Sequence, residues 1–135
     1  MTDVGAHRSE SDQAYVMRID HVALAVREPR ESLRFYQDVL RLDGPVREES
    51  YGFVLTAGHV SFTLFSGVPP SSQGEFHIGA SFPDADAVRH RRAELLALGA
   101  SELEWCDEPG YVSMKVVDPD GYVVELSWDE KHSGP

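Results

Sequence analysis

The chain repeats one pattern of residues with an offset of 56 positions. His21 opens the segment His21–Val26, and His77 opens the similar segment His77–Phe82. Apolar positions in the segments that follow also match at this offset. With 135 residues, the chain suits one domain or two small halves that share a core. The repeat indicates that two related halves are present.

The first half is predicted to form a strand, a helix and two more strands. Alternating residues predict a strand at about residues 18–26, and Pro29 suits the first turn of a helix. A broad apolar stripe runs from Leu33 to Leu42, and Asp43-Gly44-Pro45 ends the helix. Two strands are expected near residues 51–56 and 60–65. Residues 66–74 are rich in Gly, Pro and Ser, which predicts a linker.

The second half repeats this order. A strand is predicted at residues 76–82, and Asp84 is a candidate N-cap for a helix that runs to about Leu98, with Gly99 as its stop. Three short strands are expected near residues 102–106, 111–117 and 123–128, with a turn at 118–121. We therefore predict an N-terminal arm at 1–16, one domain at 17–128 made of modules 17–66 and 75–128, and a tail at 129–135.

Charge and composition exclude several classes of function. The formal net charge is -11 and only two lysines occur, Lys115 and Lys131, so nucleic acid and anionic membranes are not expected partners. No apolar run approaches the ~20 residues that a membrane span needs. Residues 1–10 lack the apolar core of a signal peptide. Cys106 is the single cysteine, which fits a reducing cytoplasm.

The candidate metal ligands are two histidines and a glutamate, His21, His77 and Glu125. A lone strand histidine is more often structural, but these two open matching strands, with small residues on the same face that leave room for a cavity. Two imidazoles and a carboxylate suit a divalent cation such as Fe, Mn, Zn or Ni and leave coordination positions open. Such a metal holds two neighbouring oxygens of a substrate and stabilises charge that develops there. Glu125 is therefore also the candidate catalytic residue.

Three stretches are specific in combination: residues 19–26 with the Phe35-Tyr36 pair, His77 with its strand, and Asp118 to Leu126. Through these stretches, which span roughly residues 17–128, the chain resembles the vicinal oxygen chelate superfamily. That group includes glyoxalase I, extradiol dioxygenases, fosfomycin resistance proteins and bleomycin-binding proteins. The resemblance implies an α+β fold in which two βαβββ modules form an open, curved mixed sheet around a central cavity. It also implies a homodimer for a chain of this length.

The chain departs from particular members of that group. Glyoxalase I has a fourth, acidic ligand at the end of the first module, where the alignment places Thr63 opposite Glu125. Fosfomycin resistance transferases use three ligands at similar spacing, but they also need cationic residues around a phosphonate, and residues 111–128 offer only Lys115. Extradiol dioxygenases use two histidines and a glutamate for iron, usually in longer chains. A lyase, isomerase, transferase or dioxygenase type of reaction stays open.

Two classes of function remain. The first is a small metal-dependent enzyme that acts on a small metabolite with neighbouring oxygens, and the histidine and carboxylate set favours it. The second is a metal-free binding protein that sequesters a drug or metabolite. Thr63, Tyr111 and Ser113 are candidates for the lining of the cavity. Glu104 is a candidate general base if it is buried, although an exposed strand residue is the simpler interpretation. His59 is expected to be exposed in a turn.

Overall fold

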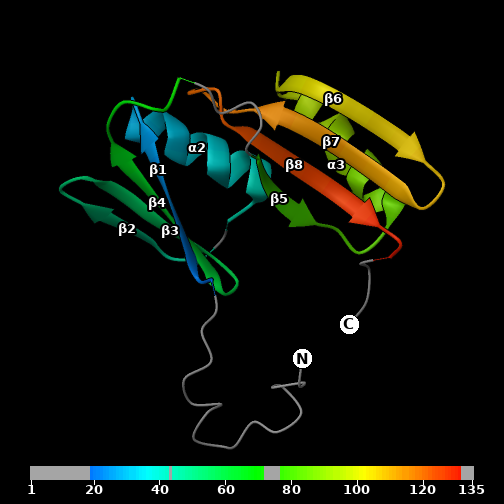
Figure 1. The fold of residues 1–135 in the computed structure, drawn as a ribbon, viewed down its shortest axis with the longest axis horizontal. Coiled ribbons are helices and arrows are strands. Elements are labelled where there is room, and N and C mark those ends of the chain that lie inside the picture. The colour runs from blue at the N-terminus through cyan, green and yellow to red at the C-terminus, as the bar shows by residue number, and fades with distance from the viewer. Residues whose placement is uncertain (1–18, 43, 72–76, 132–135) are drawn as a thin grey trace, which may run out of the picture.

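The computed structural model describes residues 19–42, 44–71 and 77–131 (Figure 1). These residues form two helices and eight strands, in the order of two matching modules. The predicted arm at 1–16, residues 72–74 of the predicted linker and residues 132–135 of the predicted tail lie outside the described residues.

The first module contains β1, α2, β2, β3 and β4, at His21–Val26, Pro29–Leu40, Val46–Glu49, Gly52–Ala57 and Val60–Ser66. Its sheet has the order β1-β4-β3-β2, in which β1 is parallel to β4 and the other neighbours are antiparallel. Pro29 occupies the first turn of α2, as predicted. The residue pattern missed β2, because this edge strand is short, mostly charged and largely exposed, without the alternation that marks a half-buried strand.

The second module contains β5, α3, β6, β7 and β8, at His77–Ser81, Ala85–Ala97, Ser101–Glu108, Tyr111–Val117 and Val123–Asp129. Its sheet order, β5-β8-β7-β6, repeats the pairing pattern of the first. Asp84 caps α3 as predicted, because its carboxylate accepts a hydrogen bond from the Ala87 N–H at 2.8 Å. Gly99 follows the helix with a φ of 87°, a conformation that favours glycine.

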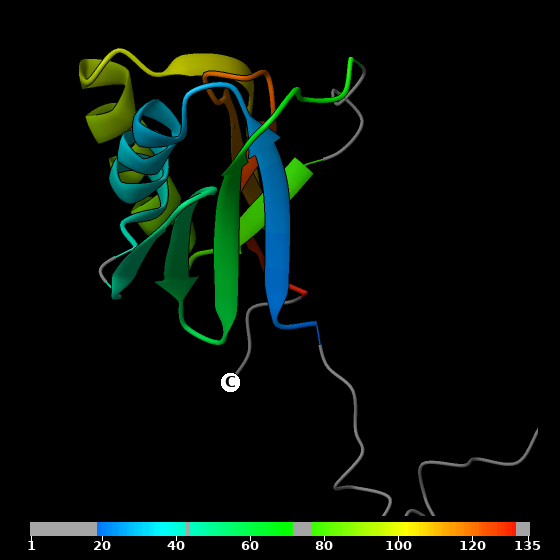
Figure 2. The same ribbon diagram turned by 90° about the vertical axis from the view of Figure 1, so that its left-hand side faces the viewer.

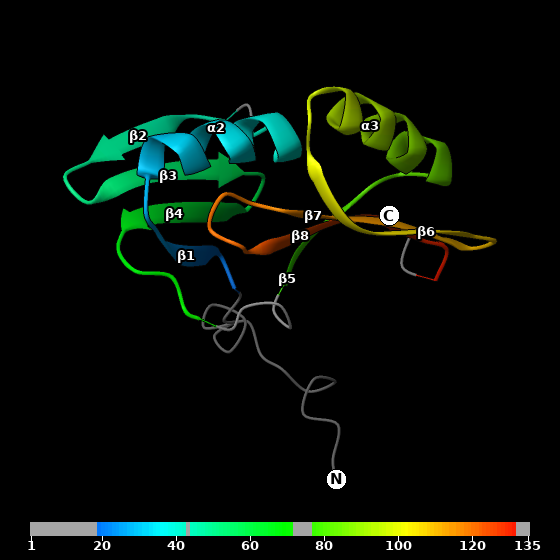
Figure 3. The same cartoon turned by 90° about the horizontal axis from the view of Figure 1, so that it is seen from above.

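Both helices lie on the same side of the two sheets, so each sheet has one face against a helix and one face turned away from the helices (Figure 2 and Figure 3). β1 and β5 are the edge strands of the two sheets that face the middle of the molecule (Figure 1). The sheets are mixed and do not close into a barrel. The predicted α+β fold of two βαβββ modules is therefore confirmed.

Strand register confirms the repeat at single residues. Ala23 pairs with Thr63 across β1 and β4. Gly79, which lies 56 positions after Ala23, pairs with Glu125 across β5 and β8. Thr63 therefore takes in the first module the place that Glu125 takes in the second, as the alignment of the sequence predicted.

One apolar core joins the two modules. It contains buried residues from both helices and from the helix-facing side of both sheets, among them Tyr36, Val39, Leu64, Leu95, Met114 and Leu126. Burial of this apolar surface is the main favourable contribution to folding, and both modules contribute to it. In the described part of the chain, neither helix has the length and apolar character needed to cross a membrane.

The turn between β7 and β8 reaches across to the first module. The Tyr36 hydroxyl donates a hydrogen bond to Asp118 Oδ2 at 2.8 Å, and Ser32 Oγ donates to Asp120 Oδ2 at 3.3 Å. The backbone N–H of Arg27 donates to Asp120 Oδ1 at 3.0 Å, and its guanidinium lies 3.3 Å from the same oxygen. We call these five residues the joint. All except Arg27 are buried, so these polar contacts are shielded from water.

Burial changes the acid–base behaviour of the joint. It raises the pKa of Asp118, although hydrogen bonds from Tyr36 and from two backbone N–H groups act in the opposite direction. The pKa of Tyr36 is also raised far above its ordinary range, by burial and then by the charge of Asp118. Tyr36 therefore keeps its proton and serves as a donor in the joint.

Candidate functional site

His77 and Glu125 lie on one face of the second sheet, on neighbouring strands. In the register of β5 and β8, His77 pairs with Val123 and Gly79 pairs with Glu125. Because side chains alternate between faces, His77 and Glu125 are diagonal neighbours on the same face. We call this face, which is turned away from α3, the open face of the second sheet. It carries His77, Gly79 and Ser81 on β5, Val123, Glu125 and Ser127 on β8, Tyr111, Ser113 and Lys115 on β7, and Glu104, Cys106 and Glu108 on β6.

Glu125 is held from the β7 side. Its side chain is 15% exposed, and Lys115, directly opposite on β7, places Nζ 3.9 Å from Glu125 Oε2. The Tyr111 hydroxyl donates a long hydrogen bond of 3.5 Å to the same oxygen. Lys115 Nζ also lies 3.4 Å from Glu104 Oε1, so one ammonium group lies between two carboxylates. These contacts orient Glu125 from β7, on the side opposite to His77.

The space on the β5 side of Glu125 is open. A Cβ atom placed on Gly79 would meet no heavy atom of the described residues within 4 Å. Gly79 lies opposite Glu125 and two residues after His77, so this open space lies between the two candidate ligands. The sequence predicted that small residues beside His77 would leave room for a cavity, and in the single chain His77, Gly79 and Ser81 lie on exposed surface.

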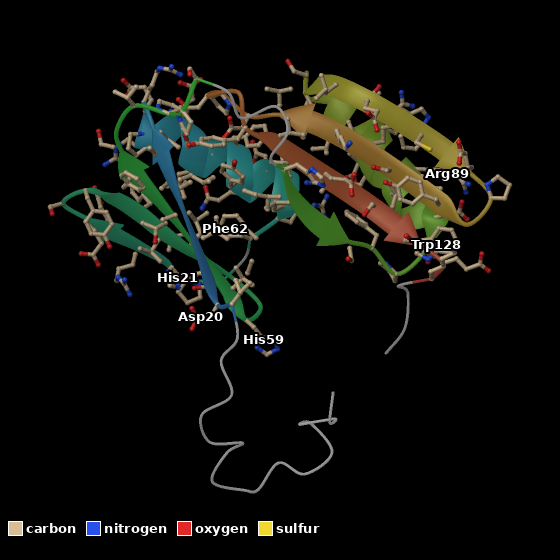
Figure 4. The ribbon with its side chains drawn as sticks, viewed as in Figure 1. Asp20, His21, His59, Phe62, Arg89 and Trp128 are labelled. Atoms are coloured by element: carbon tan, nitrogen blue, oxygen red, sulfur yellow. The ribbon has the colours of Figure 1, made fainter. Side chains whose placement is uncertain are left out.

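His21 lies at the start of β1 in the other sheet (Figure 4). Its ring Nδ1 lies 2.7 Å from Asp20 Oδ1, and its side chain is 70% exposed. β1 and β5 run in opposite directions (Figure 1), so His21 and His77, each the first residue of its strand, lie toward opposite ends of the sheets. Within the described ranges, no three His, Cys, Asp or Glu side chains of one chain are grouped to hold a metal ion. Metal binding by His21, His77 and Glu125 together stays a prediction.

The other candidate residues have different surroundings. Thr63 is half-buried on the first sheet, in the place equivalent to Glu125. Ser113 is 1% exposed, and its hydroxyl has no hydrogen-bond partner among the described residues. The side chain of Glu104 is 56% exposed, so the burial on which its role as a general base depended is not present. His59 is exposed in the turn between β3 and β4, as predicted.

Two hollows of the single chain lie away from these residues. They have volumes of about 300 and 310 Å³, and both are lined by residues of α2 and α3. Neither is lined by His21, His77 or Glu125. They are gaps on the helical side of the molecule, whereas the groups with metal-binding chemistry lie on the opposite side. We therefore place the candidate site on the open face.

Sequence reasoning missed two sets of contacts. The pairing of Lys115 with Glu125 could have been inferred, because the two residues are equidistant from Asp120 in the predicted hairpin. No sequence pattern indicated the contacts of the joint, because Tyr36 and Asp118 are 82 positions apart and belong to different modules. The turn at 118–121 was recognised only as a turn.

Solved structures with the same fold share low sequence identity with this chain. Virulence protein STM3117 from Salmonella typhimurium is 24% identical over 84% of this chain and 98% of its own, with a TM-score of 0.64. Lactoylglutathione lyase from Agrobacterium tumefaciens is 20% identical over 87% and 98%, with a TM-score of 0.70. The fosfomycin resistance protein FosX from Listeria monocytogenes, in complex with Mn(II) and sulfate, is 15% identical over 84% and 91%, with a TM-score of 0.71. Likeness at this level shows the fold alone.

The family is shown by the sequence itself. No curated protein sequence gives a significant match to the chain. The profile of one protein family matches residues 18–126, which include both modules and the residues His21, His77 and Glu125. The chain therefore belongs to the Glyoxalase/Bleomycin resistance protein/Dioxygenase superfamily.

Proposed function

We propose that the protein is a small cytoplasmic metal-dependent enzyme, which works as a homodimer on a small metabolite with two neighbouring oxygens. The observation that carries this proposal is the open space over Gly79, which lies between His77 and Glu125 on one face. An imidazole and a carboxylate are ligands that divalent transition metals prefer. The open space gives room for a cation and for a ligand bound to it. The cytoplasmic location rests on Cys106, the single cysteine of the chain.

In this proposal a second copy of the chain supplies His21. β1 and β5 are both edge strands, and their opposite directions keep His21 and His77 of one chain apart. Because the two modules are related by the repeat, the first module of one copy would pack against the second module of another copy. Two-fold symmetry then pairs the modules in both combinations, so a dimer has two equivalent sites. The ring of His21 is 70% exposed in the single chain, which leaves it accessible for such a role.

The residues of the chain fit this chemistry. Two imidazoles and one carboxylate would hold the cation, and Tyr111 would keep Glu125 oriented through the contact that it already makes. When bound, the metal supplies a Lewis acid that takes two neighbouring oxygens and stabilises charge that develops on them. The related FosX structure contains Mn(II), so Mn(II) is the first metal to test.

A metal-free binding protein is the second candidate, and one observation favours it. Glu125 already has partners in Lys115 and Tyr111, so the charge of this mostly buried carboxylate is compensated without a metal ion. In that case the open face would hold a drug or metabolite by shape and hydrogen bonding. Measurement of bound metal separates the two candidates.

Mixing two variants tests the metal site and its construction from two copies. His21→Ala removes an imidazole, and Glu125→Gln removes the carboxylate charge at nearly constant shape. Each variant alone is expected to lose Mn(II) binding, measured by electron paramagnetic resonance. In a heterodimer one site is complete, because the first variant supplies His77 and Glu125 and the second supplies His21. With about half of the dimers mixed and one site in two complete, Mn(II) binding should return to about a quarter of the parental level.

The matched control mixes the parent with the double variant H21A/E125Q, which gives the same pool of side chains. If the site is shared between copies, this mixture also binds about a quarter of the parental Mn(II). If the three ligands belong to one chain, the control binds about half and the mixture of single variants binds none. A parent protein that binds no Mn(II) overturns the enzyme proposal in favour of the metal-free binding protein.

A further inference from the structure

The open face of the second sheet has one cationic side chain, and it lies at the candidate site. Among the residues of this face, Lys115 is the only Lys or Arg. Its side chain is 24% exposed, and its Nζ lies 3.9 Å from Glu125 Oε2 and 3.4 Å from Glu104 Oε1. An ammonium group that is partly removed from water interacts more strongly with an anion than a fully solvated one does. Lys115 is therefore well placed to recognise negative charge on a ligand.

A second observation on the same strand points to a ligand. Ser113 lies two residues before Lys115 on the open face, is 1% exposed, and has no hydrogen-bond partner for its hydroxyl in the described part of the chain. Buried hydroxyl groups are nearly always hydrogen-bonded, because an unpaired one has lost water without replacement. The hydroxyl of Ser113 and the ammonium of Lys115 therefore offer two neighbouring donors to an oxyanion.

We propose that Lys115 and Ser113 recognise a carboxylate of the ligand, so that the ligand class of this site is the 2-hydroxy- and 2-oxo-carboxylates. The inference rests on the proposed function, in which the carboxylate of Glu125 binds a metal ion. Lys115 then gives up Glu125 as a partner, and the ligand carboxylate takes its place. In these acids the carboxylate is next to a second oxygen, as chelation requires. A dianionic phosphonate would need more positive charge than this face carries.

The test uses lactate, lactamide and propane-1,2-diol, which present two neighbouring polar groups and differ in charge. Their affinities for the Mn(II)-loaded protein are measured by nuclear magnetic relaxation of the ligand. Because Mn(II) itself favours a carboxylate, the informative quantity is the ratio of lactate to lactamide affinity. Lys115→Met keeps the side-chain length and removes the charge, and it should lower this ratio about tenfold. It should also strengthen Mn(II) binding by about threefold, since Lys115 no longer competes for Glu125.

Two further variants complete the experiment. Ser113→Ala should lower the ratio about threefold and leave Mn(II) affinity unchanged, and it decides the question if Lys115→Met does not fold. Lys131→Met removes the other lysine of the chain, which is exposed outside the site, and should leave every affinity as in the parent. An unchanged ratio in both site variants, with Mn(II) still bound, overturns this inference and leaves the proposed function intact. A parent that binds no Mn(II) overturns both.

Discussion

Asp118 is 4% exposed, and its carboxylate accepts hydrogen bonds from both modules. Tyr36 donates from the first module, while the backbone N–H groups of Asp120 and Tyr122 donate from the turn itself, each at 2.8 Å. Burial favours the neutral form of the carboxyl group, and the three donors favour the charged form. Burial has the larger effect, so the pKa of Asp118 is raised in the folded chain.

Asp118→Asn is expected to reduce the dependence of stability on pH. Because the folded pKa of Asp118 lies above its ordinary value of 3.8, the protonated form stabilises the folded chain. This stabilisation is fully present at pH values below the pKa of Asp118 in the unfolded chain. It is lost as the pH rises through the pKa of Asp118 in the folded chain. Asparagine does not titrate, and its amide can still accept from the two backbone N–H groups and donate to the Tyr36 oxygen.

Urea unfolding of the parent and of Asp118→Asn, measured between about pH 3.5 and pH 7, checks this expectation. The free energy of unfolding of the parent should fall relative to that of the variant as the pH rises. Tyr36→Phe serves as a control, since it removes one donor and leaves the carboxyl group able to titrate. Parallel curves for the parent and Asp118→Asn would show that Asp118 titrates alike in the folded and unfolded chains.

Most elements could be predicted because their signals are local. Alternation marked β7 and β8, and Asp84 and Gly99 marked the ends of α3. β2 could not be predicted in this way, since its residues pair through the backbone and bury little. Strand parity also placed His77 on one face with Gly79 and Ser81, and Glu125 on one face with Val123 and Ser127. Their common face required the register of β5 with β8, which no short-range pattern supplies.

The position of His21 relative to the other candidate ligands could not be predicted from the sequence. The repeat showed that His21 and His77 occupy equivalent places, but equivalence does not imply proximity. Their separation depends on the opposite directions of β1 and β5, which follow from how the two modules pack on one core. Packing between modules is set by many contacts of long sequence separation, and the contacts of the joint are among them.

Gly79→Leu tests whether the open space within the second sheet is the site. The backbone of Gly79 is outside the left-handed region, so a side chain can be accepted without strain. Leucine suits a strand better than glycine, and the melting temperature should therefore be maintained or raised. The new side chain should fill the space beside Glu125 and weaken Mn(II) binding by about tenfold or more. Gly79→Ala, which fills less of the space, should have a smaller effect on metal and the same effect on folding.

At the scale of the whole molecule, one chain leaves two sheet faces and the edge strands β1 and β5 available to another copy. The joint and the common core fix the modules relative to each other, so each copy offers a preformed surface. A site that takes ligands from two copies links metal binding to association, because the metal binds the dimer and not the separate chains.

Sedimentation equilibrium should show a mass of about twice the 15.0 kDa of the chain at micromolar concentration. Mn(II) should tighten the dimer of the parent, because every bound ion adds contacts across the interface. Mn(II) should not tighten the dimer of the His21→Ala variant, because His77 and Glu125 of one copy no longer have His21 of the other copy as a third ligand. A mass near 15.0 kDa throughout the concentration range, with or without Mn(II), would contradict the dimer.

The joint has a consequence for the history of the two modules. At the offset of the repeat, Ser32 and Tyr36 correspond to Val88 and Arg92, and the turn between β3 and β4 contains Gly58 and no acid. Donors therefore belong to the first module and carboxylates to the second. If the gene arose by duplication, the two modules have since become complementary in the joint and are no longer interchangeable. Recombination between related genes would keep this contact only when a new first half carries the hydroxyl groups and a new second half carries the acids.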